Sequence, residues 1–151
     1  MKKIAALLAI CVFAWGLPGA SAAEKGTKDE AVAMVKKAVA FLKVNGREKA
    51  LAEFNNPKGQ FVDRDLYVFV GDMQGRCVAH CIMPAYVGKD MTEYKTLEGR
   101  SITKERLKML QEKNSGWQTY KYMNPATNKI EEKSTYLERE GDLYIGVGVY
   151  Q

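Results

Sequence analysis

Cysteine and histidine are scarce in this sequence. It has three cysteines and one histidine in 151 residues, and Cys11 lies inside an N-terminal apolar run. The other two, Cys77 and Cys81, flank His80 in the order Cys-Val-Ala-His-Cys. Covalent haem attachment requires Cys-x-x-Cys-His, so this order excludes it. A disulfide between Cys77 and Cys81 is not expected either. Four residues of a strand span roughly 13 Å, about twice the separation of bridged Cα atoms.

Motifs of catalysis and of nucleic-acid binding are also missing. The sequence has no Gly-x-Ser-x-Gly, no zinc-protease helix motif and no glycine-rich phosphate loop. Its formal net charge of +5 comes from basic residues interspersed with acids, as in Lys28-Asp29-Glu30, with no Lys/Arg cluster that would follow a phosphate backbone. We therefore expect neither an enzyme nor a nucleic-acid-binding protein, and no resident cofactor.

The only long apolar run lies at the N-terminus. Lys2 and Lys3 precede the apolar stretch 4–15, Pro18-Gly19 follows it, and Ala20-Ser21-Ala22 offers small residues for cleavage. This layout is typical of a secretory signal peptide, and the run is shorter than the roughly 20 residues of a membrane span. We expect residues 1–22 to be a signal peptide and residues 23–151 to form one periplasmic or secreted domain.

Three helices are predicted in the remaining chain. Thr27 and Glu30 fit a capping box, and apolar residues then recur with a helical period to about residue 44. A second helical stretch covers residues 47–54, before a proline that forbids its continuation. A third is expected over residues 101–114.

Five strands are predicted, and with the helices they indicate an α+β fold with an antiparallel sheet. Residues 66–70 are apolar at every position, which favours a strand covered on both faces. Gly146 and Gly148 leave one face of the last strand without side chains, which predicts close approach by another backbone or a helix. The strands are expected at residues 66–70, 76–83, 117–123, 133–139 and 143–150.

The order of several motifs resembles that of a known family. These motifs are Leu66-Tyr67-Val68-Phe69-Val70, Val78-Ala79-His80, Val87-Gly88-Lys89-Asp90, Trp117-Gln118-Thr119-Tyr120, Lys133-Ser134-Thr135-Tyr136 and Tyr144-Ile145-Gly146-Val147-Gly148-Val149-Tyr150. Over about residues 29–150 the chain resembles the single Cache domain, a PAS-like extracytoplasmic sensor module of bacterial chemoreceptors and histidine kinases. Family members commonly carry proline where this chain has Cys81. They are also commonly tethered by transmembrane helices to signalling domains, which this sequence does not show.

The resemblance implies a fold and a ligand. A long N-terminal helix is expected to pack on a five- or six-stranded antiparallel PAS-like sheet with a helical connecting segment. A small ligand, often a short-chain carboxylate, is expected between the sheet and this segment.

The candidate ligand site is expected around His80 and Lys133. Strand alternation places Val78, His80 and Ile82 on one face and both cysteines on the other. His80 would donate a hydrogen bond to the ligand, and Lys133 would supply the cation that a desolvated carboxylate needs. Each candidate also has a plain structural interpretation, as a half-buried histidine, an exposed lysine or a core aromatic residue. The candidate ligand-binding residues are His80, Tyr86, Lys89, Trp117, Tyr120, Lys133 and Tyr136.

Three functional hypotheses follow. The leading one is a periplasmic domain that binds a short organic acid and acts in signal transduction or chemotaxis through a membrane sensor or transporter. The alternative is a periplasmic redox or metal-binding protein using Cys77, His80 and Cys81, although alternation separates the histidine from the cysteines and no fourth ligand is evident. The third is an interaction domain that forms a homodimer through its first helix.

Overall fold

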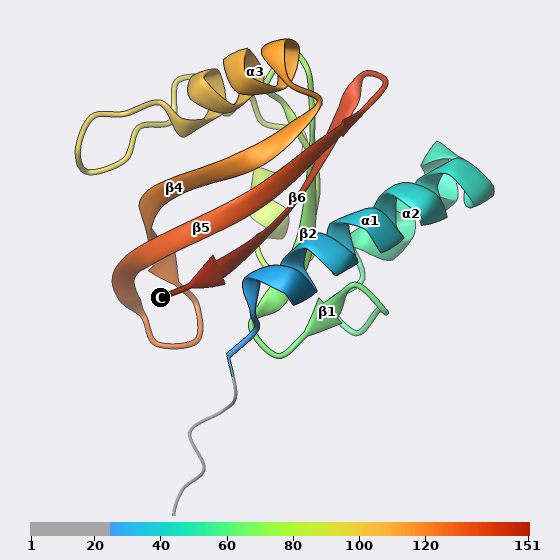
Figure 1. Ribbon diagram of the computed structural model, residues 1–151, viewed down its shortest axis with the longest axis horizontal. Helices are drawn as coiled ribbons and strands as arrows, with labels where there is room; N and C mark the ends of the chain where they lie inside the picture. Colours follow the sequence, from blue (N-terminus) through green and yellow to red (C-terminus); the bar gives the residue numbers. More distant parts are fainter. Residues whose placement is uncertain (1–24) are drawn as a thin grey trace, which may run out of the picture.

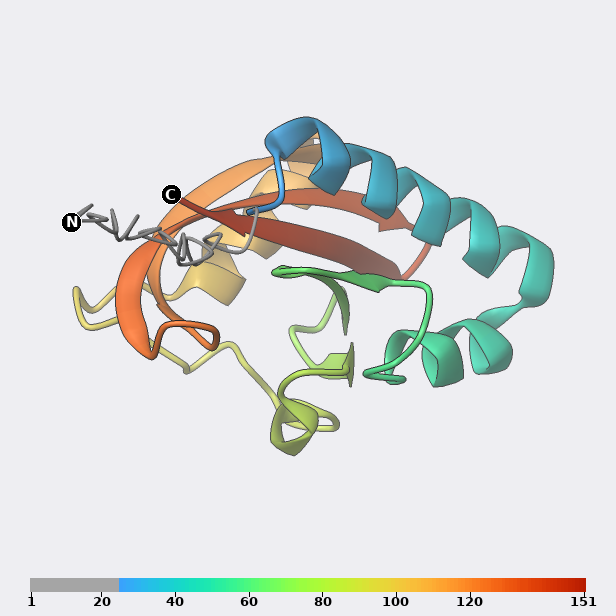
Figure 2. The ribbon, with the colours of Figure 1, turned by 90° about the horizontal axis from the view of Figure 1, so that it is seen from below.

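The computed structural model describes residues 25–151 and shows helices on both sides of one sheet (Figure 1). The long helix α1 (Lys28–Asn45) lies on one face of the sheet, and α2 (Arg47–Phe54) follows it. The short 3-10 helix η1 (Pro84–Tyr86) lies on the opposite side from α1, as Figure 2 shows. Helix α3 (Ile102–Glu112) also packs on this second face. The expected α+β fold is confirmed, while the expected signal peptide, residues 1–22, lies outside the described residues.

The sheet has six antiparallel strands. Its order is β1-β2-β6-β5-β4, and β3 pairs with the edge of β2 that also carries β1. All five predicted strands are present. The return strand is shorter than expected because the chain turns away before Pro84, and the two-residue β1 had no recognisable pattern. The strands are β1 (Val62–Asp63), β2 (Leu66–Asp72), β3 (Cys77–His80), β4 (Ser115–Asn124), β5 (Lys129–Glu140) and β6 (Leu143–Tyr150).

Helix α1 begins at the predicted capping box. The Glu30 backbone N–H donates to Thr27 Oγ1 at 3.2 Å, and the Thr27 backbone N–H donates to Glu30 Oε2 at 2.7 Å. Gly46, with a φ of 79°, separates α1 from α2. One face of α1 is buried in the core with the inward side chains of β2 and β6. Its buried residues are Ala31, Val35, Ala38, Val39 and Leu42.

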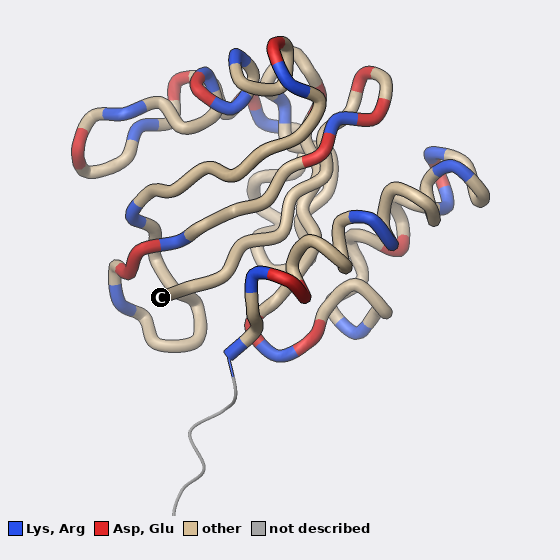
Figure 3. Tube along the Cα trace, in the orientation of Figure 1, with Lys and Arg blue, Asp and Glu red and all other residues tan. Residues whose placement is uncertain are grey.

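The two faces of the sheet bury different chemistry. Leu66, Val68 and Val70 of β2 join the apolar core beneath α1, as expected for a strand covered on both faces. The second face carries Tyr67 and Phe69 instead, with polar side chains from β4 and β5. Most charged residues lie on helices, loops and strand ends, away from the centre of the sheet (Figure 3). A charge on the second face is therefore an exception that needs a physical reason.

Gly146 and Gly148 make room for side chains of the neighbouring strands. A side-chain carbon at Gly146 would collide with the Phe69 ring, and one at Gly148 would collide with the Lys133 side chain. The prediction that another backbone or a helix approaches here is wrong. The strands on either side, β2 and β5, both lean side chains over the bare face of β6.

Candidate ligand-binding site

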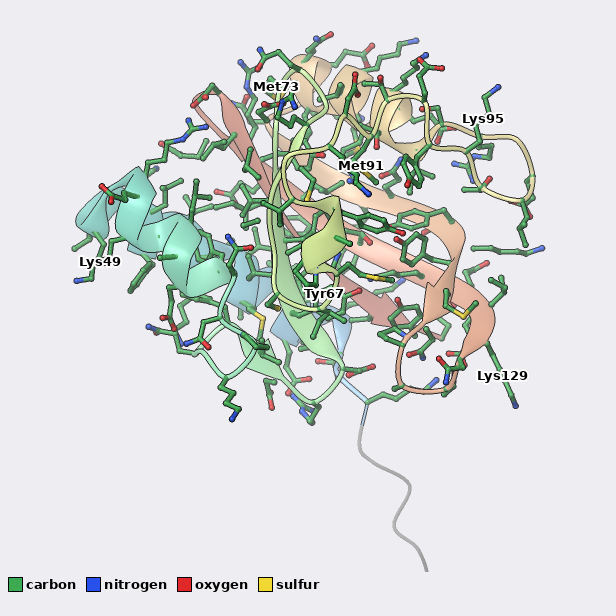
Figure 4. All side chains as sticks on the ribbon, turned by 180° about the vertical axis from the view of Figure 1, so that it is seen from behind. Lys49, Tyr67, Met73, Met91, Lys95 and Lys129 are labelled. Carbon is green, nitrogen blue, oxygen red and sulfur yellow. The ribbon has the colours of Figure 1, made fainter. Side chains whose placement is uncertain are left out.

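A cavity of about 290 Å³ lies on the second face of the sheet. Its floor is formed by β2, β4, β5 and β6, and its walls by the end of β3, by η1 and by α3. Figure 4 views this side, with the segment that carries Met91 and Lys95 running across the sheet. The polar and aromatic lining residues include Tyr67, Phe69, His80, Tyr86, Arg106, Tyr120, Lys121, Tyr122, Lys133 and Tyr144.

Lys133 is a buried cation with no acidic partner. It is 2% exposed, and its Nζ donates to the hydroxyls of Tyr67 at 2.7 Å and Tyr150 at 3.2 Å. Nζ also lies 4.5 Å and 4.7 Å from the centroids of these two rings. No carboxylate within residues 25–151 forms a salt bridge with it. Burial and the charge of Arg106 lower the pKa of Lys133 to about 7, although the charge of Asp65 acts in the opposite direction.

Arg106 is a second buried cation in the same cavity, and it is 5% exposed. Its Nε donates to Gln118 Oε1 at 3.2 Å, and Nη2 makes a long contact of 3.5 Å with the Tyr120 hydroxyl. The guanidinium lies 5.0 Å and 5.4 Å from the ring centroids of Phe69 and Tyr144. No salt bridge reaches it from the described residues. Because a guanidinium stays protonated in proteins, this charge is permanent.

His80 is a neutral hydrogen-bond donor in the cavity wall. Its backbone N–H donates to Asn55 Oδ1 at 2.9 Å, which ties β3 to the end of α2. Its Nδ1 accepts the Met83 backbone N–H at 3.1 Å, so the proton of the neutral ring is on Nε2. Burial first, and then the charges of Lys133 and Arg106, lowers the pKa of His80 to about 4. At neutral pH the Nε2–H is thus an uncharged donor, and no described residue accepts from it.

Cys77 lines the cavity because β3 contains a bulge. Val70 pairs with Ala79 but Gly71 pairs with Cys77, which leaves Val78 as the extra residue. The prediction that strand alternation separates Cys77 from His80 is therefore wrong: both line the cavity. Burial raises the pKa of the Cys77 thiol to about 11, so the thiol is protonated at neutral pH.

The cysteine–histidine trio does not form a metal site in the described part of the chain. Cys77 and Cys81 are free and buried, and Cys81 does not line the cavity. Within residues 25–151, no three His, Cys, Asp or Glu side chains are grouped closely enough to hold a metal ion. This geometry gives the metal-binding alternative no support.

The structure brings four of the seven candidate residues together. His80, Tyr86, Tyr120 and Lys133 all line the cavity, and they come from four different elements: β3, η1, β4 and β5. The Tyr120 hydroxyl also forms a 2.9 Å hydrogen bond with Thr135 Oγ1, which fixes it at the floor.

The other three candidates lie elsewhere. Trp117 and Tyr136 face each other across β4 and β5 with ring centroids 5.4 Å apart, on the face that α1 covers. Residues three apart on a strand point to opposite faces, so Trp117 cannot share a face with Tyr120, nor Tyr136 with Lys133. Lys89 is exposed on the loop after η1.

The sequence interpretation missed Arg106. The buried residues of α3 are Thr103, Arg106 and Leu110, which recur at helical spacing. An arginine on the apolar stripe was the available signal, because such a position is unusual for a charge that has no partner.

Comparison with known proteins agrees with this architecture. Residues 20–151 match the family described as single Cache domain 2. The chain belongs to this family. The predicted resemblance is confirmed, and Cache domains are extracytoplasmic sensor domains. Among residues 25–151 of this Cache domain, none of the helices has the length and apolar character needed to cross a bilayer.

Solved sensor structures share the fold. A methyl-accepting chemotaxis protein from Vibrio parahaemolyticus is 26% identical with a TM-score of 0.68, and the match covers 82% of this chain and 87% of that one. The periplasmic sensor domain of a chemotaxis protein is 21% identical, with a TM-score of 0.65 and coverage of 81% and 88%. A Cache chemosensory domain solved to explain carboxylic acid recognition is 18% identical, with a TM-score of 0.63 and coverage of 81% and 86%.

The cavity of this Cache domain has the chemistry of an anion receptor. Two buried cations, several tyrosine hydroxyls and one neutral imidazole N–H line it, together with the exposed Lys95 and Lys121, while its lining contains no Asp or Glu. Removing a cation from water is costly unless an opposite charge or hydrogen bonds compensate. The aromatic rings and hydroxyls around Lys133 and Arg106 offset part of this desolvation cost, and a bound anion would offset more of it.

Proposed function

We propose that this Cache domain is a periplasmic sensor that binds a small organic acid through its carboxylate. The observation that carries the proposal is the pair of buried cations, Lys133 and Arg106, in one cavity without an acidic lining residue. A carboxylate would accept hydrogen bonds from Lys133 Nζ, from the Arg106 guanidinium and from His80 Nε2. Carboxylic acid recognition by a Cache chemosensory domain of the same fold supports this ligand class.

We infer that a membrane sensor or transporter reads the bound state, in signal transduction or chemotaxis. The similarity to sensor domains of chemotaxis proteins supports this role. The cavity lies between the sheet, α3 and the segment that carries η1, so a bound ligand would contact all of these elements and hold them together. The homodimer predicted through the first helix stays a prediction. Because the apolar stripe of α1 is buried against the sheet, such a dimer would use the outer face of the helix.

Calorimetric titration of the secreted protein with carboxylates and with the matching amides tests the proposal. Carboxylates are expected to bind and amides are not. Lys133→Met should weaken carboxylate binding by at least about tenfold, since a hydrogen bond to a charged group contributes ~1.5–3 kcal/mol. Lys129→Met is the matched control, because Lys129 is on the same strand but exposed. Failure of every carboxylate to bind the folded protein would exclude the proposed function.

A further inference from the structure

Four exposed apolar side chains gather where the cavity opens, beside the exposed Lys95 and Lys121. Tyr94 and Leu97, in the segment before α3, line the cavity together with Met123 and Ile130. Met123 and Ile130 are cross-strand partners at the ends of β4 and β5, where the hairpin curls (Figure 2), so both line the cavity although they lie three residues from Tyr120 and Lys133. These four side chains are between 41% and 88% exposed, so they mark the side on which the cavity opens to solvent. Large apolar side chains gathered at the opening of a cavity suggest that something apolar covers them.

The base of the cavity, against the sheet, carries the two buried charges. Lys133 and Arg106 are nearly inaccessible to bulk water, and they lie against the sheet among the rings of Tyr67, Phe69 and Tyr144. The cavity thus has buried cations at its base, and at its opening four large apolar side chains with two exposed lysines beside them. A ligand that complements both ends is itself amphipathic.

The volume of the cavity agrees with a ligand larger than a short-chain acid. About 290 Å³ is room for about ten water molecules at ~30 Å³ each. Acetate has about the size of two of them and would leave water against the methionine and tyrosine walls. Apolar walls of this kind bind apolar groups, and binding sites generally bury most of their ligand.

We propose that the ligand is a monocarboxylate with an apolar body of about six to eight carbon atoms. The carboxylate reaches the buried cations, and the body, a ring or a chain, lies between the connecting segment and the ends of β4 and β5. This inference rests on the proposed function and names its ligand class. It differs from the short-chain acid that the family resemblance implies.

A series of acids tests the inference. Phenylacetate, hexanoate, acetate and succinate are titrated into the purified protein by calorimetry. Each buried methylene strengthens binding by up to about fourfold, so phenylacetate or hexanoate should bind at least about tenfold more tightly than acetate. Succinate should bind less tightly than hexanoate, because its second carboxylate would have to leave water to lie beside Tyr94, Leu97, Met123 and Ile130.

Substitutions at the opening locate the apolar body. Leu97→Ser and Met123→Ser should weaken binding of the preferred longer acid by about threefold to tenfold and leave acetate unchanged. Val44→Ser is the matched control, because Val44 is 84% exposed on α1, on the other side of the sheet. It should alter neither affinity.

The outcomes separate the two proposals. If acetate binds as tightly as both longer acids, or succinate binds most tightly, the apolar body is wrong while carboxylate sensing stands. If the longer acids bind more tightly but Leu97→Ser and Met123→Ser have no effect, the placement at the opening is wrong. If none of the four acids binds, the proposed function fails as well.

Discussion

Lys133→Met is expected to stabilise the ligand-free protein while it removes the proposed carboxylate binding. Methionine keeps an unbranched side chain over Gly148 but carries no charge. In the folded protein burial lowers the pKa of Lys133 from 10.5 to about 7. Between these pH values the folded state binds fewer protons than the unfolded state, so the free energy of unfolding of the wild type rises with pH.

The magnitude follows from this shift. At pH 7 a shift of roughly three units destabilises the fold by ~4 kcal/mol relative to an uncharged side chain. The hydrogen bonds to Tyr67 and Tyr150, which the variant loses, offset about 1 kcal/mol each. We therefore expect Lys133→Met to raise the free energy of unfolding by ~2 kcal/mol at pH 7. The gain should shrink by about 1.4 kcal/mol per pH unit as the pH rises and vanish between pH 8 and 9, where the remaining charge penalty of the wild type equals the hydrogen bonds that the variant loses.

Urea unfolding followed by circular dichroism at pH 7, 8 and 9 measures this effect. Lys129→Met serves as the control, since Lys129 extends from the start of the same strand into solvent (Figure 4). It should change the free energy of unfolding by less than about 0.5 kcal/mol at each pH. A Lys133→Met protein that is less stable than the wild type at pH 7, or a gain that does not shrink with pH, would refute the reasoning.

Three further predictions concern the same cavity. Carboxylate affinity should be highest from about pH 5 to 7 and fall by up to about tenfold per unit above pH 7, because the free protein loses the Lys133 proton there. Calorimetry at constant ionic strength measures this dependence, and an affinity that does not change with pH would contradict it. Gly148→Ala should displace Lys133, weaken carboxylate binding by at least about tenfold and destabilise the fold by ~1–3 kcal/mol; unchanged affinity would mean that the position of Lys133 is not needed. Alkylation of Cys77 at pH 8 should be at least about a hundredfold slower in the folded protein than in the urea-unfolded protein, because burial raises the pKa of the Cys77 thiol to about 11. Equal alkylation rates in the two states would show that the folded protein has an accessible thiolate.

Local patterns predicted most of the secondary structure because neighbouring residues determine it. The capping box of Thr27 and Glu30, the apolar period that follows it and Pro57 set the limits of the first two helices. Strand β6 was predicted with the correct ends, because turn residues flank a run of β-forming residues. The two-residue β1 had no comparable pattern, since it is defined only by its pairing with β2.

The facing of side chains depended on details that a regular pattern does not contain. One extra residue, Val78, turned Cys77 to the same side as His80. Trp117 and Tyr136 do not line the cavity, for a simpler reason. They were grouped with Tyr120 and Lys133 by chemistry, although their positions three residues away place them on the opposite face.

The sequence by itself determined the α+β class, the positions of the helices and strands, and the membership of a sensor family, because these depend on order along the chain. It also pointed to His80, Tyr120 and Lys133. Only the tertiary structure decided that Arg106 of α3 meets Lys133 of β5 in one cavity without an acidic lining residue. The physical reason is that such convergence depends on how α3 packs across the sheet, on the bulge in β3 and on the space above Gly148, and none of these is a local property of the chain.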